Sequence, residues 1–157
     1  MKRSKVLVQE SDFDVAEEIR WLRHGLPEIG AVATFIGTVR DINENSKVSA
    51  MTLEHYPGMT ERALAAIVDE ARERWPLLNV CVIHRVGELA AGDPIVFVGV
   101  ASAHRDAAFD ACRFIMDFLK TRAPFWKRES TPAGERWVDE RAGDQIAAGR
   151  WQLEKKS

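Results

Sequence analysis

The sequence predicts an α+β fold. Strand-like and helix-like patterns are mixed along the 157 residues without the strict alternation that a doubly wound parallel sheet requires. Neighbouring strand patterns also follow one another closely, as they do in antiparallel hairpins. Apolar residues make up 46% of the chain, which is enough to bury a core. Because no repeat, low-complexity tract or linker divides the sequence, we expect residues 1–157 to form a single domain.

Turn and cap residues delimit the elements of the N-terminal half. Asp14 is a predicted helix N-cap, and Gly25 is placed to end that helix. Small and β-branched residues between 29 and 40 favour a strand, in which Gly30 and Gly37 mark close backbone approach or a bulge. The elements predicted in order are a strand at 5–9, a helix from 14 to about 24, a strand at 29–40, a polar loop at 41–47 and a strand at 48–56.

The C-terminal half begins with a turn at Pro57-Gly58, after which Thr60 is the predicted cap of a helix that Pro76 ends. Apolar residues at helical spacing support this helix: Leu64, Ile67, Val68, Ala71 and Trp75. The elements predicted after it are a strand at 80–86, a turn at 87–93, an apolar strand at 95–102, a long helix at about 106–122, a strand at 136–138 and a short helix at 144–150.

Composition and charge exclude several classes of function. The formal net charge of -2 argues against a nucleic-acid-binding protein, which usually carries a strong basic excess. The N-terminus has basic residues but no apolar run of signal-peptide length. No segment approaches the roughly 20 apolar residues that span a bilayer. We therefore expect a cytoplasmic protein that binds neither nucleic acid nor membrane.

The cysteines and histidines indicate neither a metal site nor a reactive sulfur. Cys81 falls in an apolar strand and Cys112 in a helix, without CxxC spacing, so both are expected to be packed thiols. The four histidines show no metal-ligand spacing with one another or with cysteine. The sequence therefore predicts no metal ion and no cofactor.

The stretch HRDAAFDACRFIMDFLKTRAPFWKRE at 104–129 combines a helix with a concentration of cationic side chains. Five of its cationic or protonatable groups lie at the ends of the predicted helix or shortly after it: His104, Arg105, Lys120, Lys127 and Arg128. The first two open the predicted helix, Lys120 lies near its end, and Pro124 breaks it. Such an excess of positive charge around one short element, in a chain of net charge -2, predicts an anionic ligand.

The helical periodicity leaves two interpretations of Lys120 open. The predicted core face consists of Ala107, Ala111, Phe114, Ile115, Phe118 and Leu119. Lys120 falls on the polar side, where a solvated lysine paired with Asp117 is the common case. However, Phe109 and Met116 fall beside Lys120 and off the core face, which favours an apolar groove wall or a protein contact there.

His104 and Arg105 also have two interpretations. A helix N-terminus offers free N–H groups and the positive end of the helix dipole, so two cationic side chains there favour an anion site. Alternatively, His104 is a buried, hydrogen-bonded histidine and Arg105 pairs with Asp106 or Asp110. The sequence pattern favours the anion site because the side chains and the dipole act together.

Four motifs resemble the large, catalytic subunit of molybdopterin synthase, the MoaE family. They are EHYPGMTERAL at 54–64, IHRVGEL at 83–89, VFVGVASAHRDAAFDA at 96–111 and MDFLKTRAPFWKRE at 116–129. The similarity extends from about Gly30 to Trp151. It implies an α/β-hammerhead type of fold, with a mixed or antiparallel sheet and packed helices. It also implies a homodimer of this chain, and a heterotetramer in which each copy binds a small ubiquitin-like sulfur carrier.

The resemblance implies a sulfurtransferase of molybdenum cofactor biosynthesis. The family converts cyclic pyranopterin monophosphate, or precursor Z, into molybdopterin by adding two sulfurs as a dithiolene. The sulfur comes from a thiocarboxylate at the carrier's Gly-Gly C-terminus. The family's active-site lysines fall on Lys120 and Lys127. Its anion-binding residues fall on Arg40, His104, Arg105 and Arg141, of which the last is expected to act across the dimer. Residues that line or support the pocket fall on Phe35, Met116 and Glu129.

The cationic stretch agrees with this implied chemistry. The substrate's phosphate and the carrier's thiocarboxylate are both negative, and an uncompensated contact in a partly desolvated site would cost on the order of several kcal/mol. We expect Lys120 to neutralise the thiocarboxylate, to stabilise an oxyanion and, when neutral, to be able to attack the acyl group. Lys127 is the candidate for proton transfer. We expect Arg128 and Glu129 to meet the carrier's tail.

Two other classes of function stay open at the level of sequence. The first is a Schiff-base lyase that uses Lys120 or Lys127 on a small phosphorylated carbonyl compound. The second is a non-catalytic dimeric module, in which the cationic groups only dock an anion or a protein tail. Dependence on a thiocarboxylated partner distinguishes the sulfurtransferase from both.

Overall fold

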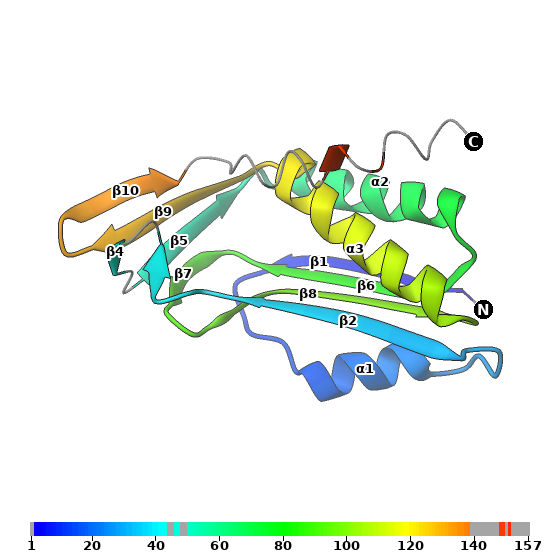
Figure 1. Cartoon of the computed structure of the whole chain (residues 1–157). Helices are drawn as coiled ribbons and strands as arrows, with labels where there is room; N and C mark the ends of the chain where they lie inside the picture. The colour runs from blue at the N-terminus through cyan, green and yellow to red at the C-terminus, as the bar shows by residue number, and fades with distance from the viewer. Residues whose placement is uncertain (1, 44–45, 48–49, 139–147, 150, 152–157) are drawn as a thin grey trace.

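The computed structural model describes residues 2–43, 46–47, 50–138, 148–149 and 151. Within this part of the chain, three helices pack with two four-stranded sheets and one short two-stranded hairpin. The first sheet and its helices form one end of the molecule, and the second sheet extends from it at the other end (Figure 1). This arrangement confirms the predicted α+β class with a mixed sheet and packed helices.

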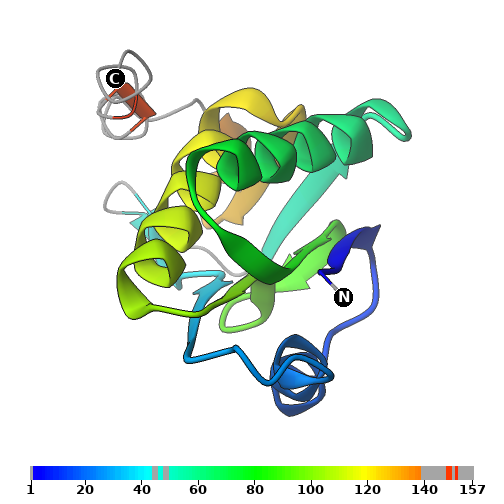
Figure 2. The same ribbon diagram turned by 90° about the vertical axis from the view of Figure 1, so that its right-hand side faces the viewer.

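The first sheet has the strand order β1-β6-β8-β2. Its strands are β1 (Ser4–Gln9), β6 (Leu77–Arg85), β8 (Pro94–Ser102) and β2 (Ala31–Thr38). The β1 and β6 strands run parallel, and the other pairs are antiparallel. The α2 helix (Met59–Arg74) and the α3 helix (Arg105–Arg122) cover one face, and α1 (Val15–Arg23) covers the other (Figure 2). The sheet is therefore buried on both sides.

The side chains of the central β6 strand reflect this double coverage. Val80 and Val82 belong to the core cluster formed with α2 and α3. Cys81 and Ile83 belong to a second cluster, formed with α1. Because successive side chains of a strand point to opposite faces, a continuous apolar run is what such a strand requires.

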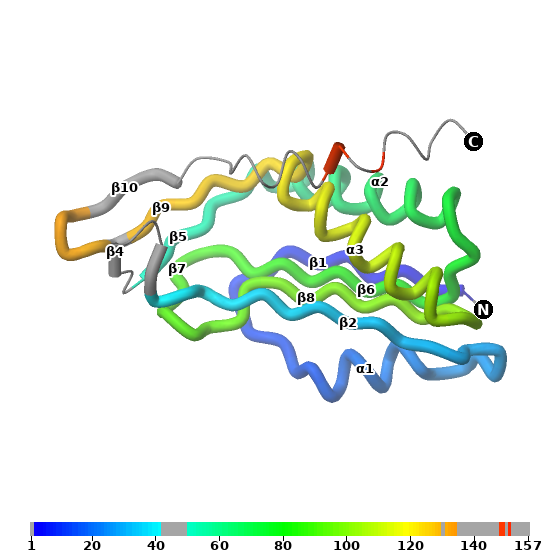
Figure 3. Tube along the Cα trace, in the orientation of Figure 1, coloured from blue at the N-terminus to red at the C-terminus, as the bar shows by residue number. Residues whose placement is uncertain are grey.

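The second sheet is antiparallel throughout, with the order β10-β9-β5-β7. Its strands are β10 (Gly134–Val138), β9 (Phe125–Thr131), β5 (Ala50–His55) and β7 (Gly87–Ala90). The β7 strand follows β6 after a single residue, and β9 follows α3 after two. The path of the chain through both sheets can be followed in Figure 3. Because both connections are short, they limit movement of the second sheet relative to the first.

Gly30, directly before β2, and Gly37, within it, have the roles that the sequence predicted. A Cβ atom on Gly30 would lie 2.2 Å from the carbonyl oxygen of Ala103, a contact that no side chain can make. A Cβ atom on Gly37 would lie 2.8 Å from Cγ1 of Val96, and the pairing of β2 with β8 shifts register directly after Gly37. Close approach and a bulge are thus both present.

The helix limits agree closely with the cap signals. Asp14 accepts a hydrogen bond of 3.2 Å from the backbone N–H of Glu17 and so caps α1. The α2 helix ends at Arg74, two residues before Pro76. The predicted Thr60 cap is wrong: Gly58 is the N-cap, and its N–H donates to the Glu61 carboxylate at 2.9 Å. Thr60 instead lies buried in the first turn.

Three predictions for the connections are corrected by long-range pairing. The predicted turn at 87–93 contains the β7 strand, which pairs with β5. The predicted loop at 41–47 contains two short strands, β3 (Ile42–Asn43) and β4 (Ser46–Lys47), which pair with each other. The β9 strand was not predicted after Pro124 because its charged residues have no strand pattern of their own. Of the short helix predicted at 144–150, the structure describes only helical residues 148–149.

Candidate active site at the junction of the two sheets

The two lysines predicted to be catalytic are carried by consecutive elements. Lys120 is exposed in the last turn of α3, which ends at Arg122. Pro124 then prevents further helix, and β9 begins at Phe125. Lys127 is the third residue of that strand and is partly buried. A helix end and a strand start thus place both amines near the junction of the two sheets.

Strand alternation separates Lys127 from its neighbour Arg128. Lys127 pairs with Leu53 of β5, and Leu53 is 1% exposed, so this face of the second sheet points inward. Trp126 and Arg128 point to the opposite face, and Trp126 is 46% exposed. The sequence prediction that Arg128 belongs to the same cationic cluster as Lys127 is therefore corrected. Glu129 shares the inward face with Lys127 and is buried.

A buried histidine that the sequence did not single out lies between the two sheets. His84, near the end of β6, is 4% exposed and its ring stacks on Phe125 of β9, with centroids 3.9 Å apart and planes at 21°. Its Nδ1 atom lies 2.9 Å from the carbonyl oxygen of Arg85. A carbonyl only accepts, so Nδ1 carries the proton and a neutral ring leaves Nε2 with its lone pair.

The electrostatics of His84 bring the two lysines together. Burial lowers the pKa of His84 from 6.5 to about 3, and the positive charges of Lys127, Lys120 and His55 add to this lowering. The hydrogen bond to Arg85 offsets only part of the effect. The charges of both lysines therefore act on the same buried ring. The sequence did not single out His84, although a histidine within an apolar strand is a visible signal.

His84 is expected to make the protein less stable in mild acid. The unfolded chain binds a proton at His84 near pH 6.5, whereas the folded protein does so only near pH 3. The free energy of unfolding therefore falls as the pH drops between these values, by up to about 1.4 kcal/mol per pH unit. His84→Phe removes this contribution, so urea denaturation from about pH 7 to pH 4 should give a shallower pH dependence than the wild type.

A buried substitution on the same strand provides the control for this measurement. Val82→Ala, two residues earlier on β6, leaves a cavity and should lower the stability by a similar amount at every pH. Equal pH dependence in His84→Phe and the wild type would show that His84 does not titrate as described.

The anion-binding residues predicted at the start of α3 lie far from the lysines. His104 is the N-cap and Arg105 the first helical residue, and both are exposed. At 1.5 Å per residue, about 22 Å of helix separates Arg105 from Lys120. The two groups lie at opposite ends of α3 (Figure 1). They do not form one cluster within a single chain, because the helix that joins them in sequence holds them apart in space.

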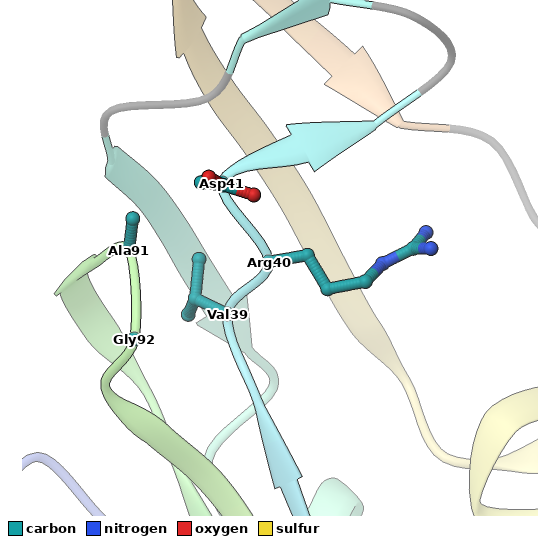
Figure 4. A pocket seen from close by; sticks show the side chains of 5 residues that line it. All are labelled: Val39, Arg40, Asp41, Ala91 and Gly92. Carbon is teal, nitrogen blue, oxygen red and sulfur yellow. The ribbon is translucent and has the colours of Figure 1, made fainter.

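Arg40 lies in a third place, directly after β2. It lines an open cavity of about 610 Å³, whose described lining residues are Val39, Arg40, Asp41, Ala91 and Gly92. The Arg40 side chain extends away from Ala91 and Gly92 (Figure 4). Lys120 and Lys127 do not line this cavity. Arg141 lies outside the described residues.

Two apolar residues beside the predicted groove behave differently from each other. Phe109 is 64% exposed, as its place off the predicted core face indicated. Met116 is only 9% exposed and belongs to the main core, so the prediction that it stands off the core is wrong. The α3 helix contacts α2 as well as the first sheet. It therefore buries a wider face than a helix that packs on a sheet alone, and this face includes Met116. Phe35, on the edge strand β2, is 42% exposed.

Both cysteines are packed thiols, as predicted. Cys81 is fully buried against α1, and Cys112 is buried in α3. Burial raises the pKa of each thiol to about 12, and the Glu18 carboxylate also raises that of Cys81. Thiolate is the nucleophilic form, so neither residue is suited to carry reactive sulfur. In the described part of the chain, no cluster of three His, Cys, Asp or Glu residues resembles a metal site, and no helix is long and apolar enough to cross a membrane.

Comparison with known proteins identifies the family of this chain. The sequence model of the family described as MoaE protein matches residues 8–122. The molybdopterin synthase catalytic subunit of Escherichia coli (strain K12) is 63% identical over 151 residues, covering 96% of this chain and 100% of that protein. The structure of the molybdopterin biosynthesis MoaE protein from Burkholderia ambifaria MC40-6 is 52% identical, with a TM-score of 0.82, and covers 95% of this chain and 98% of that chain.

A more distant structure has the same fold. It is a complex of subunits 1 and 2 of the molybdopterin-converting factor from Helicobacter pylori 26695, matched at 17% identity and a TM-score of 0.70 over 88% of this chain and 91% of that chain. A helix and strand order shared at such low identity supports the architecture independently of the motifs. The family model and the identity to full-length relatives together establish that the chain belongs to the MoaE family.

Proposed function

We propose that this protein is the catalytic subunit of a molybdopterin synthase. It transfers sulfur from the C-terminal thiocarboxylate of a small carrier protein to a cyclic pyranopterin monophosphate, and two transfers make the dithiolene of molybdopterin. The observation that carries the proposal is the pair Lys120 and Lys127, which act on one buried ring at the sheet junction in a chain 63% identical to such a subunit.

Charge is the main requirement of this reaction. The thiocarboxylate sulfur must approach a substrate that already carries a phosphate, so two anions meet in one place. Lysine ammonium groups cancel this repulsion without contributing a nucleophile of their own. The donor sulfur arrives from outside, which agrees with two cysteines that are both buried and protonated.

The lysines have separate roles in the proposed sequence of steps. The thiocarboxylate sulfur bonds to a side-chain carbon of the pterin as the carbon–oxygen bond at that carbon breaks, and the oxygen leaves on the phosphate or, after protonation, as water. The carrier is then joined to the substrate through a thioester. Water then adds to the acyl carbon, and Lys120 stabilises the resulting oxyanion. The C–S acyl bond breaks, the sulfur stays on the substrate, and the carrier leaves with a carboxylate. Lys127 moves the protons that this hydrolysis requires. Glu129, buried on the same face as Lys127, supports the pocket from within, and Arg128, on the opposite face of β9, is the candidate for a contact with the carrier.

The positions of His104 and Arg105 are best explained by a homodimer. A small substrate cannot contact both ends of a helix about 22 Å long. A two-fold axis perpendicular to α3 would, however, place the start of one α3 beside the end of its partner. We therefore assign phosphate binding to His104 and Arg105 of one copy and sulfur transfer to Lys120 and Lys127 of the other. Arg40 and Arg141 are the remaining candidates for phosphate contacts.

An exposed apolar surface supports this dimer. The β2 strand lies at the edge of the first sheet, and its Phe35 and Ile36 side chains are 42% and 41% exposed. Phe109 lies on α3, the helix that packs on β2, and is 64% exposed. An unpaired edge strand with apolar side chains is a surface that proteins normally cover. We also place the reaction in the cytoplasm, where two free thiols stay reduced.

Reconstitution tests the proposed function directly. Purified chain, thiocarboxylated carrier and precursor Z are mixed, and the product is identified by mass. We expect a product that has gained two sulfurs, and none when the carrier ends in an ordinary carboxylate. Covalent trapping of a carbonyl substrate by borohydride, without need of a carrier, would instead identify a Schiff-base lyase. Binding of the carrier without any product would identify a docking module.

A further inference from the structure

The turn between the two lysines is held by a buried hydroxyl. Thr60, in the first turn of α2, is fully buried and donates a hydrogen bond of 3.0 Å to the carbonyl oxygen of Pro124. The same Oγ1 atom accepts one of 3.0 Å from the N–H of Tyr56, directly after β5. One side chain therefore joins the end of β5, the start of α2 and the turn that leads from Lys120 to Lys127.

The next residue of the turn is held by a second contact, made by His84. Its ring lies against Phe125, the first residue of β9, at a centroid distance of 3.9 Å. The bond between Nδ1 and the Arg85 carbonyl limits rotation of the ring. His84 belongs to the first sheet and Phe125 to the second, so this stack fixes the start of β9 relative to the first sheet.

The contacts of Thr60 and His84 hold the segment of chain between Lys120 and Lys127, the two amines of the proposed reaction. Pro124 is four residues after Lys120, and Phe125 is two residues before Lys127 on the same face of β9. A shift of the turn would therefore move Lys127 with the strand while Lys120 stays with the helix. We infer that Thr60 and His84 are positioning residues that set the distance between the Lys120 and Lys127 amines, and that the two act together as one anchor.

The chemistry of His84 suits a place beside two amines. The charged or protonatable side chains whose charges act on its ring are Lys120 from α3, Lys127 from β9 and His55 from β5. A protonated imidazole there would add a further positive charge without a described partner and would repel both lysines. A neutral ring can pack against Phe125 and still satisfy the Arg85 carbonyl, which a leucine or a phenylalanine could not do.

Four variants and one control test this anchor. Thr60→Val keeps the shape of the side chain but removes the hydroxyl, and Thr60→Ser restores it. His84→Ala removes the ring, and His84→Phe restores a neutral ring that can stack. Val82→Ala is the control, because it weakens the same face of β6 two residues from His84 but takes no part in the Thr60 hydrogen bonds or the stack of His84 on Phe125. The role in turnover rests on the proposed function, so one of the two measurements is independent of activity.

The independent measurement is competitive acetylation followed by mass spectrometry. The reaction rates of Lys120 and Lys127 are compared with that of exposed Lys2 in the same sample. We expect Thr60→Val and His84→Ala to change the ratio of the Lys127 rate to the Lys120 rate by about threefold or more, because a shift of the start of β9 changes the surroundings of partly buried Lys127 while exposed Lys120 stays on the helix. Thr60→Ser and Val82→Ala should keep ratios close to that of the wild type. His84→Phe restores the stack but not the bond to Arg85, so its ratio should lie closer to that of the wild type than the ratio of His84→Ala does.

The second measurement is turnover in the reconstituted reaction. We expect Thr60→Val and His84→Ala to lower kcat by about 10- to 100-fold, with KM for the pterin nearly unchanged, since a misplaced group costs rate rather than binding. Wild-type acetylation ratios in both variants would overturn the anchor, and so would an equal change in Val82→Ala. If the wild-type protein shows no turnover in the reconstituted reaction, the proposed function is overturned. The acetylation ratios would still decide whether the anchor exists.

Discussion

Replacing Lys120 by alanine is expected to abolish sulfur transfer while leaving the protein folded and able to bind its carrier. The lysine is exposed in the last turn of α3, so its loss should change the free energy of unfolding by no more than about 0.5 kcal/mol. In the proposed mechanism, by contrast, its charge stabilises an oxyanion. Loss of such a group typically lowers kcat by about 100- to 1,000-fold.

Single-turnover kinetics and carrier titration separate these two effects. Lys120→Arg keeps the positive charge but cannot release a proton near neutral pH, so it should recover part of the rate if the charge is what matters. Arg113→Ala, an exposed change on the same helix, is the matched control and should retain wild-type turnover. Near-normal turnover in Lys120→Ala would remove this residue from the mechanism.

Mixing two inactive variants is expected to restore activity. In Lys120→Ala, the end of α3 is defective, and in the double variant His104→Ala/Arg105→Ala, its start is defective. If each site combines the start of one α3 with the end of the other, a mixed dimer has one intact site. Equal mixing makes about half of the dimers mixed, so about a quarter of wild-type activity should return.

The control for this experiment combines two defects that lie in the same half of the site. Lys120→Ala and Lys127→Ala both disable the end of α3 or the strand that follows it, so a mixed dimer of these variants has no intact site. The expected result is recovery in the first mixture and none in the second, measured after unfolding and refolding the chains together. No recovery in the first mixture would show that the start of one α3 and the end of its partner do not share a site.

Elements that are set by local chemistry could be predicted from the sequence. The Asp14 cap, the Pro76 stop and the apolar β6 and β8 strands all depend on neighbouring residues, and the structure has them within a few residues. The β7 and β9 strands could not be predicted in this way. Each is a strand because it pairs with β5, and β5 lies far from both in sequence.

The site was predictable to a similar extent. The motif resemblance pointed to Lys120 and Lys127, and the structure brings these two residues to one buried ring. Helical periodicity gave the wrong side for Met116, because it contains no information about the second helix that packs on α3. The sequence also suggested one cationic cluster from residues that an 18-residue helix holds apart. Residues that are close in sequence therefore often belong to the same helix, but they do not necessarily contribute to the same site.

The close approach of Gly30 to the carbonyl oxygen of Ala103 has a consequence for substrate capture. Ala103 immediately precedes His104, so the residue that touches it determines where α3 begins. The opposite end of the helix is fixed by different neighbours, through Pro124 and Phe125. In the proposed site, affinity for the phosphate and speed of sulfur delivery are thus controlled at separate points, so a substitution at either end of α3 should leave the other property unchanged.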